Sequence, residues 1–440
     1  MKLRIFLRAA AHAALGGLLL AFPAALAAQN GNSLPFRKAV ELALRNSAAS
    51  AIAGAEEQHA RAVYLQGRDL FLPQVTFGSG LAETYGFPLS VGGSGPSLFN
   101  VNTQQFLINP AQRQFNKAAR NDIKTVQIQN EDRRNEVIME TALDYMQLDL
   151  LQSTYTVLRE QQDFTAKLED IVSQRVQAGL EGSLELTRAR LASARTRLQV
   201  ADTRAAIDQL RLRLAQLTGL PAGDIQTSTE SIPPLPDVSQ NDDLLAVAAA
   251  ASPAVRSAEA AAESKALRAR GEQRQMYPAI DLVAQYSLFS NFNNYNKFYN
   301  NFQMNNITVG ASIRFPFLSA TQRWTAAAAS ADALKARKDA QNLRDQVSSE
   351  TLKLQRSVEQ LAAAREVSRL EHQLSEADVE TAHEKIQAGE ATLKDEQTAK
   401  ITEHEHYTAY LDSGFQLDKA QVQLLRQTGE LESWAVGPRR

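Results

Sequence analysis

The segment Arg175-Val-Gln-Ala-Gly179 recurs later in the chain as Lys385-Ile-Gln-Ala-Gly389, at a shift of 210 positions. Further matches at this shift are Gln112-Arg113 with Gln322-Arg323, and Thr218-Gly219 with Thr428-Gly429. Upstream the shift is 205, and the matches there are Ser47 with Ser252 and Phe71-Leu-Pro73 with Met276-Tyr-Pro278. The chain therefore contains an internal duplication, which has to be recognised before any fold is assigned. Because the shift rises from 205 at Pro278 to 210 at Gln322, the second copy has about five extra residues between these two positions.

In each copy, the sequence predicts a short helix, a pair of strands and two very long helices. Proline is absent from residues 111–220 and 317–436, and only six glycines lie in these two stretches. Because an interior proline costs a helix ~3 kcal/mol and a glycine ~1 kcal/mol relative to alanine, such runs favour unusually long helices. At ~1.5 Å per residue, a helix from Ala111 to Ala178 would be roughly 100 Å long. A compact globule has no room for it.

Heptad spacing indicates that these helices pair as coiled coils. After Gly179, leucines recur every seven residues with one alanine in the series, and a second set of small residues follows three positions on. The leucine stripe is Leu184, Leu191, Leu198, Ala205 and Leu212, and the second set is Thr187, Ala194 and Ala201. This pattern is typical of a coiled-coil seam. Gly179 and Gly389 can take the left-handed conformation that closes a helix, so we expect the distal turns of two helical hairpins there, with returning helices that end at Gly219 and Gly429.

The strand pairs are predicted at about 279–317 and 74–109. Residues 306–317 alternate between an apolar and a polar face. The apolar face holds Ile307, Val309, Ala311, Ile313 and Phe315, and the other holds Thr308, Gly310, Ser312 and Arg314. The partner strand, 279–288, places Ile280, Leu282, Ala284, Tyr286 and Leu288 opposite Asp281, Gln285 and Ser287. In the first copy, 75–87 has one apolar face with the exceptions Ser79 and Glu83, and 97–109 is the return strand, with weaker alternation.

The amino terminus has the features of a secretory signal. Three basic residues, a short apolar centre and small residues that suit cleavage occupy residues 1–27; a retained membrane helix is the alternative. The first repeat then covers 28–232 and the second 233–440, joined by a proline-rich stretch. An exported protein is the expectation.

The composition excludes several kinds of site and partner. The chain has no cysteine, which excludes disulfides, thiolate metal sites and a lipidated amino-terminal cysteine. Removal of the three signal-peptide cations would change the formal net charge from −2 to −5, and the remaining charges are interspersed. Nucleic-acid binding usually needs a basic face, so we expect no nucleic-acid partner.

Strands of about ten residues suit a membrane-spanning barrel. Two pairs give four strands, which cannot close, and an open sheet edge is not tolerated in hydrocarbon. If the strands span a membrane, several chains must therefore share one barrel.

In this arrangement the sequence resembles the TolC-like outer-membrane efflux protein family. The segments that carry the resemblance are Leu34-Pro-Phe-Arg-Lys-Ala-Val-Glu-Leu-Ala-Leu44 with Asn46, Leu72-Pro73, Tyr277-Pro278, Phe315-Pro-Phe317, the two Ala-Gly tips and Leu217-Thr-Gly-Leu-Pro221. The resemblance implies a mixed α and β membrane protein: a homotrimer whose chains give four strands each to a twelve-stranded barrel in outer-membrane lipid, continued by a periplasmic α-helical coiled-coil barrel. Such proteins are channels of tripartite efflux or type I secretion systems, with a periplasmic adaptor and an inner-membrane transporter as partners. No cofactor and no enzymatic activity is implied.

The resemblance also assigns candidate site residues. Gly179 and Gly389 match the family's helix-turn glycines, and the acids six positions on, Glu185 and Asp395, match its periplasmic gate. Three copies of Asp395 around one axis would form an acidic ring that attracts cations and favours partial protonation. The tip residues that resemble adaptor-contacting segments are Ala178, Gly179, Leu180, Ala388 and Gly389, and the lumen-facing strand residues are Thr308, Ser312 and Arg314.

Three positions depart from the family pattern. Ile386, Ala391 and Thr398 stand where a tyrosine, an arginine and a second aspartate would complete a polar lock. We therefore expect a gate held more by helix packing and adaptor contact than by an arginine-centred network. Glu390, in place of an apolar residue, weakens the expectation of adaptor contact at the second tip.

Two other interpretations remain. The run Glu403-His-Glu-His406 invites a metal site, but residues two apart do not share a helix face and the spacing is not that of a zinc helix, so a solvated helix face is expected there and no metal site. A secreted periplasmic coiled-coil scaffold or adaptor-like protein is the alternative function. It would wash free at high salt, whereas a barrel would need detergent.

Overall fold

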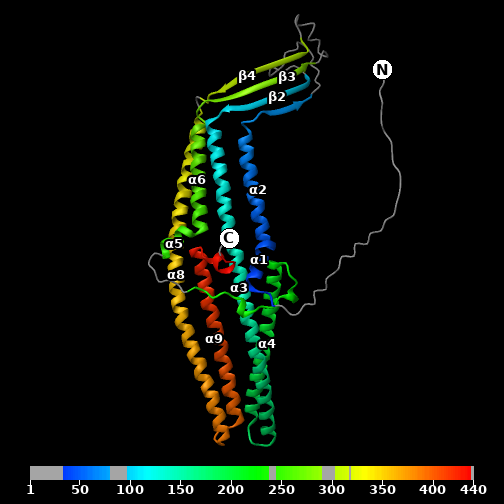
Figure 1. Ribbon diagram of the computed structural model, residues 1–440, viewed down its shortest axis with the longest axis vertical. Helices are drawn as coiled ribbons and strands as arrows, with labels where there is room; N and C mark the ends of the chain where they lie inside the picture. The colour runs from blue at the N-terminus through cyan, green and yellow to red at the C-terminus, as the bar shows by residue number, and fades with distance from the viewer. Residues whose placement is uncertain (1–32, 80–96, 237–243, 290–302, 317–318, 438–440) are drawn as a thin grey trace, which may run out of the picture.

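The computed structural model describes residues 33–79, 97–236, 244–289, 303–316 and 319–437. It is an elongated molecule with a four-stranded sheet at one end and two helical hairpins at the other (Figure 1). The predicted signal peptide, residues 80–87 of the first predicted strand and Phe317 lie outside the described residues.

The two copies contain helices of matching length. The pairs are α2 (Ala48–Asp69) with α6 (Pro253–Arg274), α3 (Pro110–Gln177) with α8 (Ala320–Gln387), and α4 (Ser183–Thr218) with α9 (Leu393–Thr428). They contain 22, 68 and 36 residues respectively. The duplication and the very long helices are thus confirmed. Serine side chains at Ser47 and Ser252 cap α2 and α6, accepting hydrogen bonds from the backbone N–H groups of Ser50 and Val255.

Most of the length difference between the copies lies after the last strand. In the first copy Asn109 alone separates the end of β2 (Ser97–Ile108) from α3, whereas residues 315–319 separate β4 (Asn305–Arg314) from α8. Four of the five extra residues predicted between Pro278 and Gln322 are therefore in this connection.

The helices form a single curved row rather than a globule. In the half beside the sheet the order is α2, α3, α6, α8, and in the half beyond it is α4, α3, α9, α8. Only α3 and α8 run through both halves (Figure 1). Each long helix is thus packed along its sides and leaves broad faces uncovered in the single chain.

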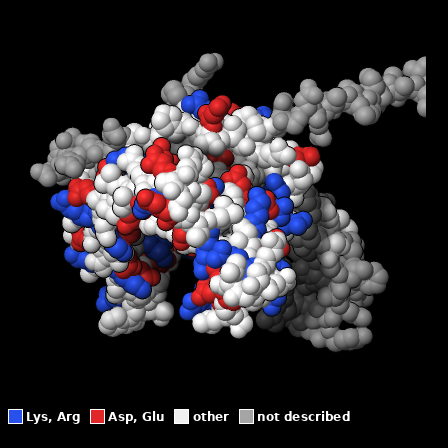
Figure 2. Space-filling view, turned by 90° about the horizontal axis from the view of Figure 1, so that it is seen from below, with Lys and Arg blue, Asp and Glu red and all other residues white. Residues whose placement is uncertain are grey.

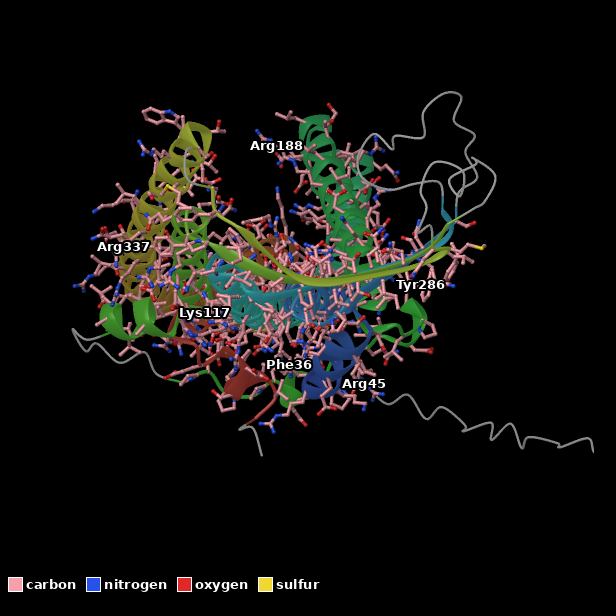
Figure 3. All side chains as sticks on the ribbon, turned by 90° about the horizontal axis from the view of Figure 1, so that it is seen from above. Phe36, Arg45, Lys117, Arg188, Tyr286 and Arg337 are labelled. Atoms are coloured by element: carbon pink, nitrogen blue, oxygen red, sulfur yellow. The ribbon has the colours of Figure 1, made fainter. Side chains whose placement is uncertain are left out.

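A compact core joins the first and last described helices to the middle of α3. The first helix, α1 (Phe36–Asn46), buries Phe36, Ala39, Val40 and Ala43, the spacing of one helix face. Phe36 packs edge-to-face on Tyr145 of α3 and on Trp434 of α10 (Leu431–Ala435), with ring centroids 5.4 and 5.3 Å apart. Viewed from above, Phe36 lies on α1 among the helices (Figure 3).

Tyr145 also organises the connector between the copies. Its hydroxyl donates to the Leu34 carbonyl at 2.6 Å and accepts from the Ser228 N–H at 2.9 Å. The connector carries two short 3-10 turns, η1 (Ala222–Asp224) and η2 (Thr229–Ser231), before α5 (Leu244–Ala251) begins the second copy's helices. One fully buried side chain thereby pairs with a backbone group of the connector and with one of the segment before α1.

The leucine stripe of α4, which has the spacing of a coiled-coil seam, does not pack against the other helix of its own hairpin. Those leucines are 50–61% exposed, and a different heptad series packs on α3. The buried series is Ala189, Ser193, Thr196, Val200, Ile207, Leu210 and Leu214. The two series are offset by two residues, about 200° around the helix, so only one can face α3. Period alone does not say which stripe meets which partner.

The sheet is antiparallel throughout, in the order β1 (Gln74–Gly78), β2, β3 (Ala279–Phe289), β4. Its register confirms the predicted faces. Ile313, Ala311, Val309 and Ile307 oppose Ile280, Leu282, Ala284 and Tyr286, while Ser312 and Thr308 oppose Asp281 and Gln285. β4 ends at Arg314, shortly before Pro316, which has no N–H to continue the ladder. β1 and β4 are the two edge strands, and every residue of β4 is exposed in the single chain.

One ion pair fixes the polar face near the helices. The Arg314 guanidinium contacts the buried Asp281 carboxylate at 2.5 Å, and Gln104 of β2 donates to the same oxygen at 3.2 Å. The three residues come from neighbouring strands β2, β3 and β4. They tie the two copies together across the sheet.

A buried carboxyl in α3 predicts a specific pH dependence. Burial raises the pKa of Asp144 to about 6, although Arg213 of α4, with its Nε 3.3 Å from Asp144 Oδ2, opposes the shift. The folded chain therefore holds this proton more tightly than the unfolded chain, and stability falls as pH rises from about 4 to about 6.

We expect Asp144→Asn to raise the melting temperature at pH 8 by roughly 2–4 °C, because it removes a buried charge. Arg213 would still have an ion pair, with Glu140 at 2.9 Å. Thermal melts of the purified protein at pH 4 and pH 8 check this. The gain should vanish at pH 4. An equal gain at both values would mean that ionisation of Asp144 is not its source.

Candidate functional site: the hairpin tips and the polar sheet face

Both hairpins turn at a glycine in the left-handed region, as predicted. Gly179 has φ 73° and Gly389 has φ 77°. In each turn the next N–H returns to a carbonyl five residues back, Leu180 to Arg175 at 2.9 Å and Glu390 to Lys385 at 2.8 Å. No heavy atom lies within 4 Å of a Cβ built on either glycine. Backbone conformation, not crowding, therefore requires glycine here.

The predicted adaptor-contacting residues lie at the far ends of the hairpins and are all exposed. They are Ala178, Gly179 and Leu180 at the first tip, and Ala388 and Gly389 at the second. Leu180 is 68% exposed, so the first tip presents an apolar side chain. Acidic and basic side chains are interspersed over the face seen from below (Figure 2).

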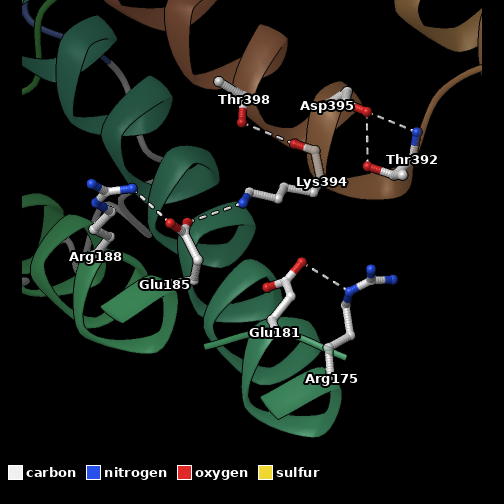
Figure 4. Close-up of polar contacts among 8 residues, drawn as sticks. All are labelled: Arg175, Glu181, Glu185, Arg188, Thr392, Lys394, Asp395 and Thr398. Atoms are coloured by element: carbon white, nitrogen blue, oxygen red, sulfur yellow. Dashed lines mark hydrogen bonds and ion pairs between the residues drawn. The ribbon is translucent and has the colours of Figure 1, made fainter. Parts of the chain in front are cut away.

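Glu185 links the two tips. One of its carboxylate oxygens lies 3.1 Å from Lys394 Nζ of α9, and the other accepts from Arg188 at 2.6 Å (Figure 4). The Lys394 ammonium first, and Arg188 with it, hold the pKa of Glu185 below its ordinary value. The Glu185–Lys394 pair connects residues 209 positions apart, and we name it the tip latch.

Asp395 caps its own helix. Its Oδ2 accepts from the backbone N–H and from the hydroxyl of Thr392, both at 2.8 Å (Figure 4). These bonds lower the pKa of Asp395. The direction is opposite to the one that a ring of three like charges would impose. In the single chain the carboxylate is exposed, and the acidic ring stays a prediction.

The polar face of the sheet carries the three predicted lumen-facing residues of β4 together with two residues of β3. They are Thr308, Ser312 and Arg314, with Asp281 and Gln285. Seen from above, the sheet passes over the ends of the helices, and Tyr286 lies on it (Figure 3). The described helices include none that is long and apolar enough to cross a membrane.

Comparison with solved structures identifies the architecture. The CmeC outer membrane channel of Campylobacter jejuni is 17% identical over 90% of this chain and 86% of that chain, with a TM-score of 0.74. The chain has the TolC-like fold. VceC, an outer membrane protein of Vibrio cholerae, is 18% identical over 89% and 96%, with a TM-score of 0.71. The MtrE outer membrane channel of Neisseria gonorrhoeae, in its open state, is 16% identical over 92% and 89%, with a TM-score of 0.69. No protein-family model and no curated protein matches the sequence.

At the three positions that depart from the TolC-like pattern, the structure shows no substitute lock. Thr398 donates to the Lys394 carbonyl of its own helix at 2.9 Å, and Ile386 and Ala391 are half-buried apolar side chains. The sequence did not predict the contact between Lys394 and Glu185. The sequence holds only a weak indication of it: at the shift of 210, Leu184 of the first copy corresponds to Lys394, which directly precedes Asp395.

Proposed function

We propose that this chain is an exported outer-membrane channel. Three copies share one barrel, and their helices continue it as a tunnel through the periplasm. A periplasmic adaptor meets the exposed tips and passes substrate from an inner-membrane transporter. The observation that carries the proposal is the sheet: four strands, two unpaired edges and one apolar face left exposed on top of long helical hairpins.

The exposed sheet face has the chemistry of a lipid-facing surface. Ile307, Val309 and Ile313 of β4 are each at least 68% exposed, and Phe77 of β1 is 72% exposed. Polar side chains and the Asp281–Arg314 pair occupy the opposite face. Alternation of this kind, apolar outside and polar inside, is what a barrel around a water-filled pore requires. Pairing β4 of one chain with β1 of the next would satisfy both edges.

The helical part supports the same assembly. The exposed leucine stripe of α4 and an exposed apolar stripe on α8, Val367, Leu370 and Leu374, lie on the two flanking helices of the row. Contact between α4 of one copy and α8 of the next would cover both stripes. The same rotation would then close the sheet and the helical row.

Engineered cysteines test the shared barrel, since the natural chain has none. Thr76→Cys in β1 and Thr308→Cys in β4, joined by a short bifunctional maleimide in isolated membranes, should give a ladder that ends at three chains. The control is Asn102→Cys with Gln285→Cys, which are paired within one chain and should give no ladder. A monomeric Thr76–Thr308 product, or a chain that washes off at high salt, would favour the soluble scaffold.

We expect the tip latch to hold the channel end closed. Lys394→Gln removes the partner of Glu185, and the ratio of open to closed time in bilayer recordings should rise by roughly two- to fivefold, since the pair is exposed and weak. The lowered pKa of Glu185 means that the latch is present above pH 4.5 and is lost only at lower pH, as the pH falls through the folded-state value. The control is Lys400→Gln, whose partner Glu396, at 2.9 Å, lies on the same helix. If both variants gate alike, the latch has no such role.

We propose that Asp395 sets the ion preference of the narrow end. Asp395→Asn removes the charge and keeps an oxygen that can accept from Thr392. The ratio of cation to anion permeability should fall, and block by multivalent cations should weaken. Glu390→Gln makes the same charge change at the exposed turn. It should alter the permeability ratio and the block by multivalent cations less than Asp395→Asn does. Unchanged selectivity in Asp395→Asn would remove the acidic ring from the account.

A further inference from the structure

A cluster of histidine and glutamate side chains lies between α8 and α9, away from the tips. His372 and Glu376 are one turn apart on α8, and Glu403 faces them from α9. His372 Nε2 is 2.9 Å from Glu403 Oε1 and 3.8 Å from Glu376 Oε1. One nitrogen and two carboxylate oxygens all lie within 4.8 Å of one another.

The separations fit a small divalent cation. Ligand atoms bound tetrahedrally to zinc at ~2.1 Å lie about 3.4 Å apart, and the two measured distances fall on either side of this value. Among the described residues, no lysine or arginine lies within ion-pair distance of Glu376 or Glu403. Two carboxylates thus face His372, and the neighbouring basic groups are imidazoles rather than ammonium or guanidinium groups.

Surrounding groups hold the imidazole in place. The His372 side chain is 14% exposed and packs against the rings of Tyr407 and Tyr410, with centroids 4.9 and 6.2 Å away. The other oxygen of Glu403 is 3.5 Å from His404 Nε2. Glu376 is 58% exposed, so that solvent and ions reach the cluster from its side.

His404 corrects the expectation of a solvated helix face. Its side chain is only 12% exposed and packs near Phe164 of the first hairpin, with ring centroids 5.6 Å apart. Its Nδ1 is buried and has no hydrogen-bond partner. The expectation was wrong at His404 because α9 packs against α3 of the first hairpin, a contact that spacing within α9 does not reveal.

The duplication shows that hairpin packing does not require the cluster. The first hairpin has helices of the same lengths, yet the positions 210 residues earlier hold Gln162, Ala166 and Ser193. None of these combines with the others into a metal-ligand set. Hairpins of the same helix lengths therefore form with and without this cluster.

We propose that His372, Glu376 and Glu403 bind a divalent first-row transition metal of the zinc class. Mixed imidazole and carboxylate ligands suit Zn²⁺, whereas Mg²⁺ and Ca²⁺ prefer oxygen alone. The metal joins α8 to α9 about 22 Å from the turn, so that its occupancy stiffens the second hairpin and leaves the first unchanged. This role is independent of the cargo and of the channel activity.

The test is calorimetric titration of ZnCl₂ into the full-length, detergent-purified protein without a histidine tag, after chelator treatment, together with the visible absorption of the Co²⁺ form. We expect one zinc per chain and the intense visible bands of a low-coordinate Co²⁺ site. His372→Gln, which installs the residue of the first copy, should weaken zinc binding at least ~10-fold. Glu376→Gln, at an exposed position, should weaken it too.

The matched control is His383→Gln. His383 lies on the same helix and pairs with Glu396 at 3.4 Å, but it lacks a third ligand. Its titration should match the natural chain, and all variants should elute at the natural size. Absence of saturable binding, or affinity that is unchanged in both His372→Gln and Glu376→Gln, would overturn the proposal. Equal loss in His383→Gln would do the same.

Discussion

Val309→Arg should prevent stable assembly in the membrane, while Thr308→Arg should be tolerated. Val309 lies in the middle of β4 on the apolar face, opposite Ala284, and is 68% exposed. An arginine on the lipid face near the midplane of a barrel costs about 2–4 kcal/mol, and each trimer would carry three. Thr308 is the adjacent residue on the polar face, where a charge can remain in water.

The yield of detergent-extracted trimer measures this effect. Far-UV circular dichroism of each variant checks that the helices persist. The expected result is a large loss of trimer for Val309→Arg alone. Equal yields from the two variants would mean that the two sheet faces meet the same solvent, contrary to a barrel in lipid.

Phe36→Ala should destabilise the folded chain by about 3–5 kcal/mol. The ring is fully buried and joins α1 to Tyr145 of α3 and Trp434 of α10. Its removal leaves a cavity where α1 and α10 meet the connector. The measurement is the shift in the melting temperature, followed by tryptophan fluorescence, to which the buried Trp434 and the exposed Trp324 both contribute.

Tyr145→Phe is the comparison for that variant. It keeps the ring and removes only the hydroxyl, which donates to the Leu34 carbonyl and accepts from the Ser228 N–H. We expect a smaller loss of about 1–3 kcal/mol. If Phe36→Ala cost no more than Tyr145→Phe, the aromatic cluster would not be the main contact between α1, α3 and α10.

Features with a strong local signal were predictable from the sequence. The helix-closing glycines Gly179 and Gly389 occur at their expected turns with positive φ, since few other residues adopt that conformation. The faces of β4 follow from strict alternation, and the register with β3 confirms them. The duplication was readable because both copies retain their turn residues.

Features that depend on which surfaces meet were not predictable. The leucines of α4 have the right period but face away from α3, and the choice between two heptad stripes is made by the neighbouring helix. Lys394 and Glu185 come together across two hairpins, and His372 reaches Glu403 across one turn. Sequence spacing within a helix contains no information about such contacts.

The most direct test of the channel is planar-bilayer recording of the full-length, detergent-extracted protein, with its mass measured in parallel. We expect discrete single-channel currents from a trimer, with longer openings in Lys394→Gln. A monodisperse monomer that stays soluble without detergent, and that gives no current in either form, would contradict the account.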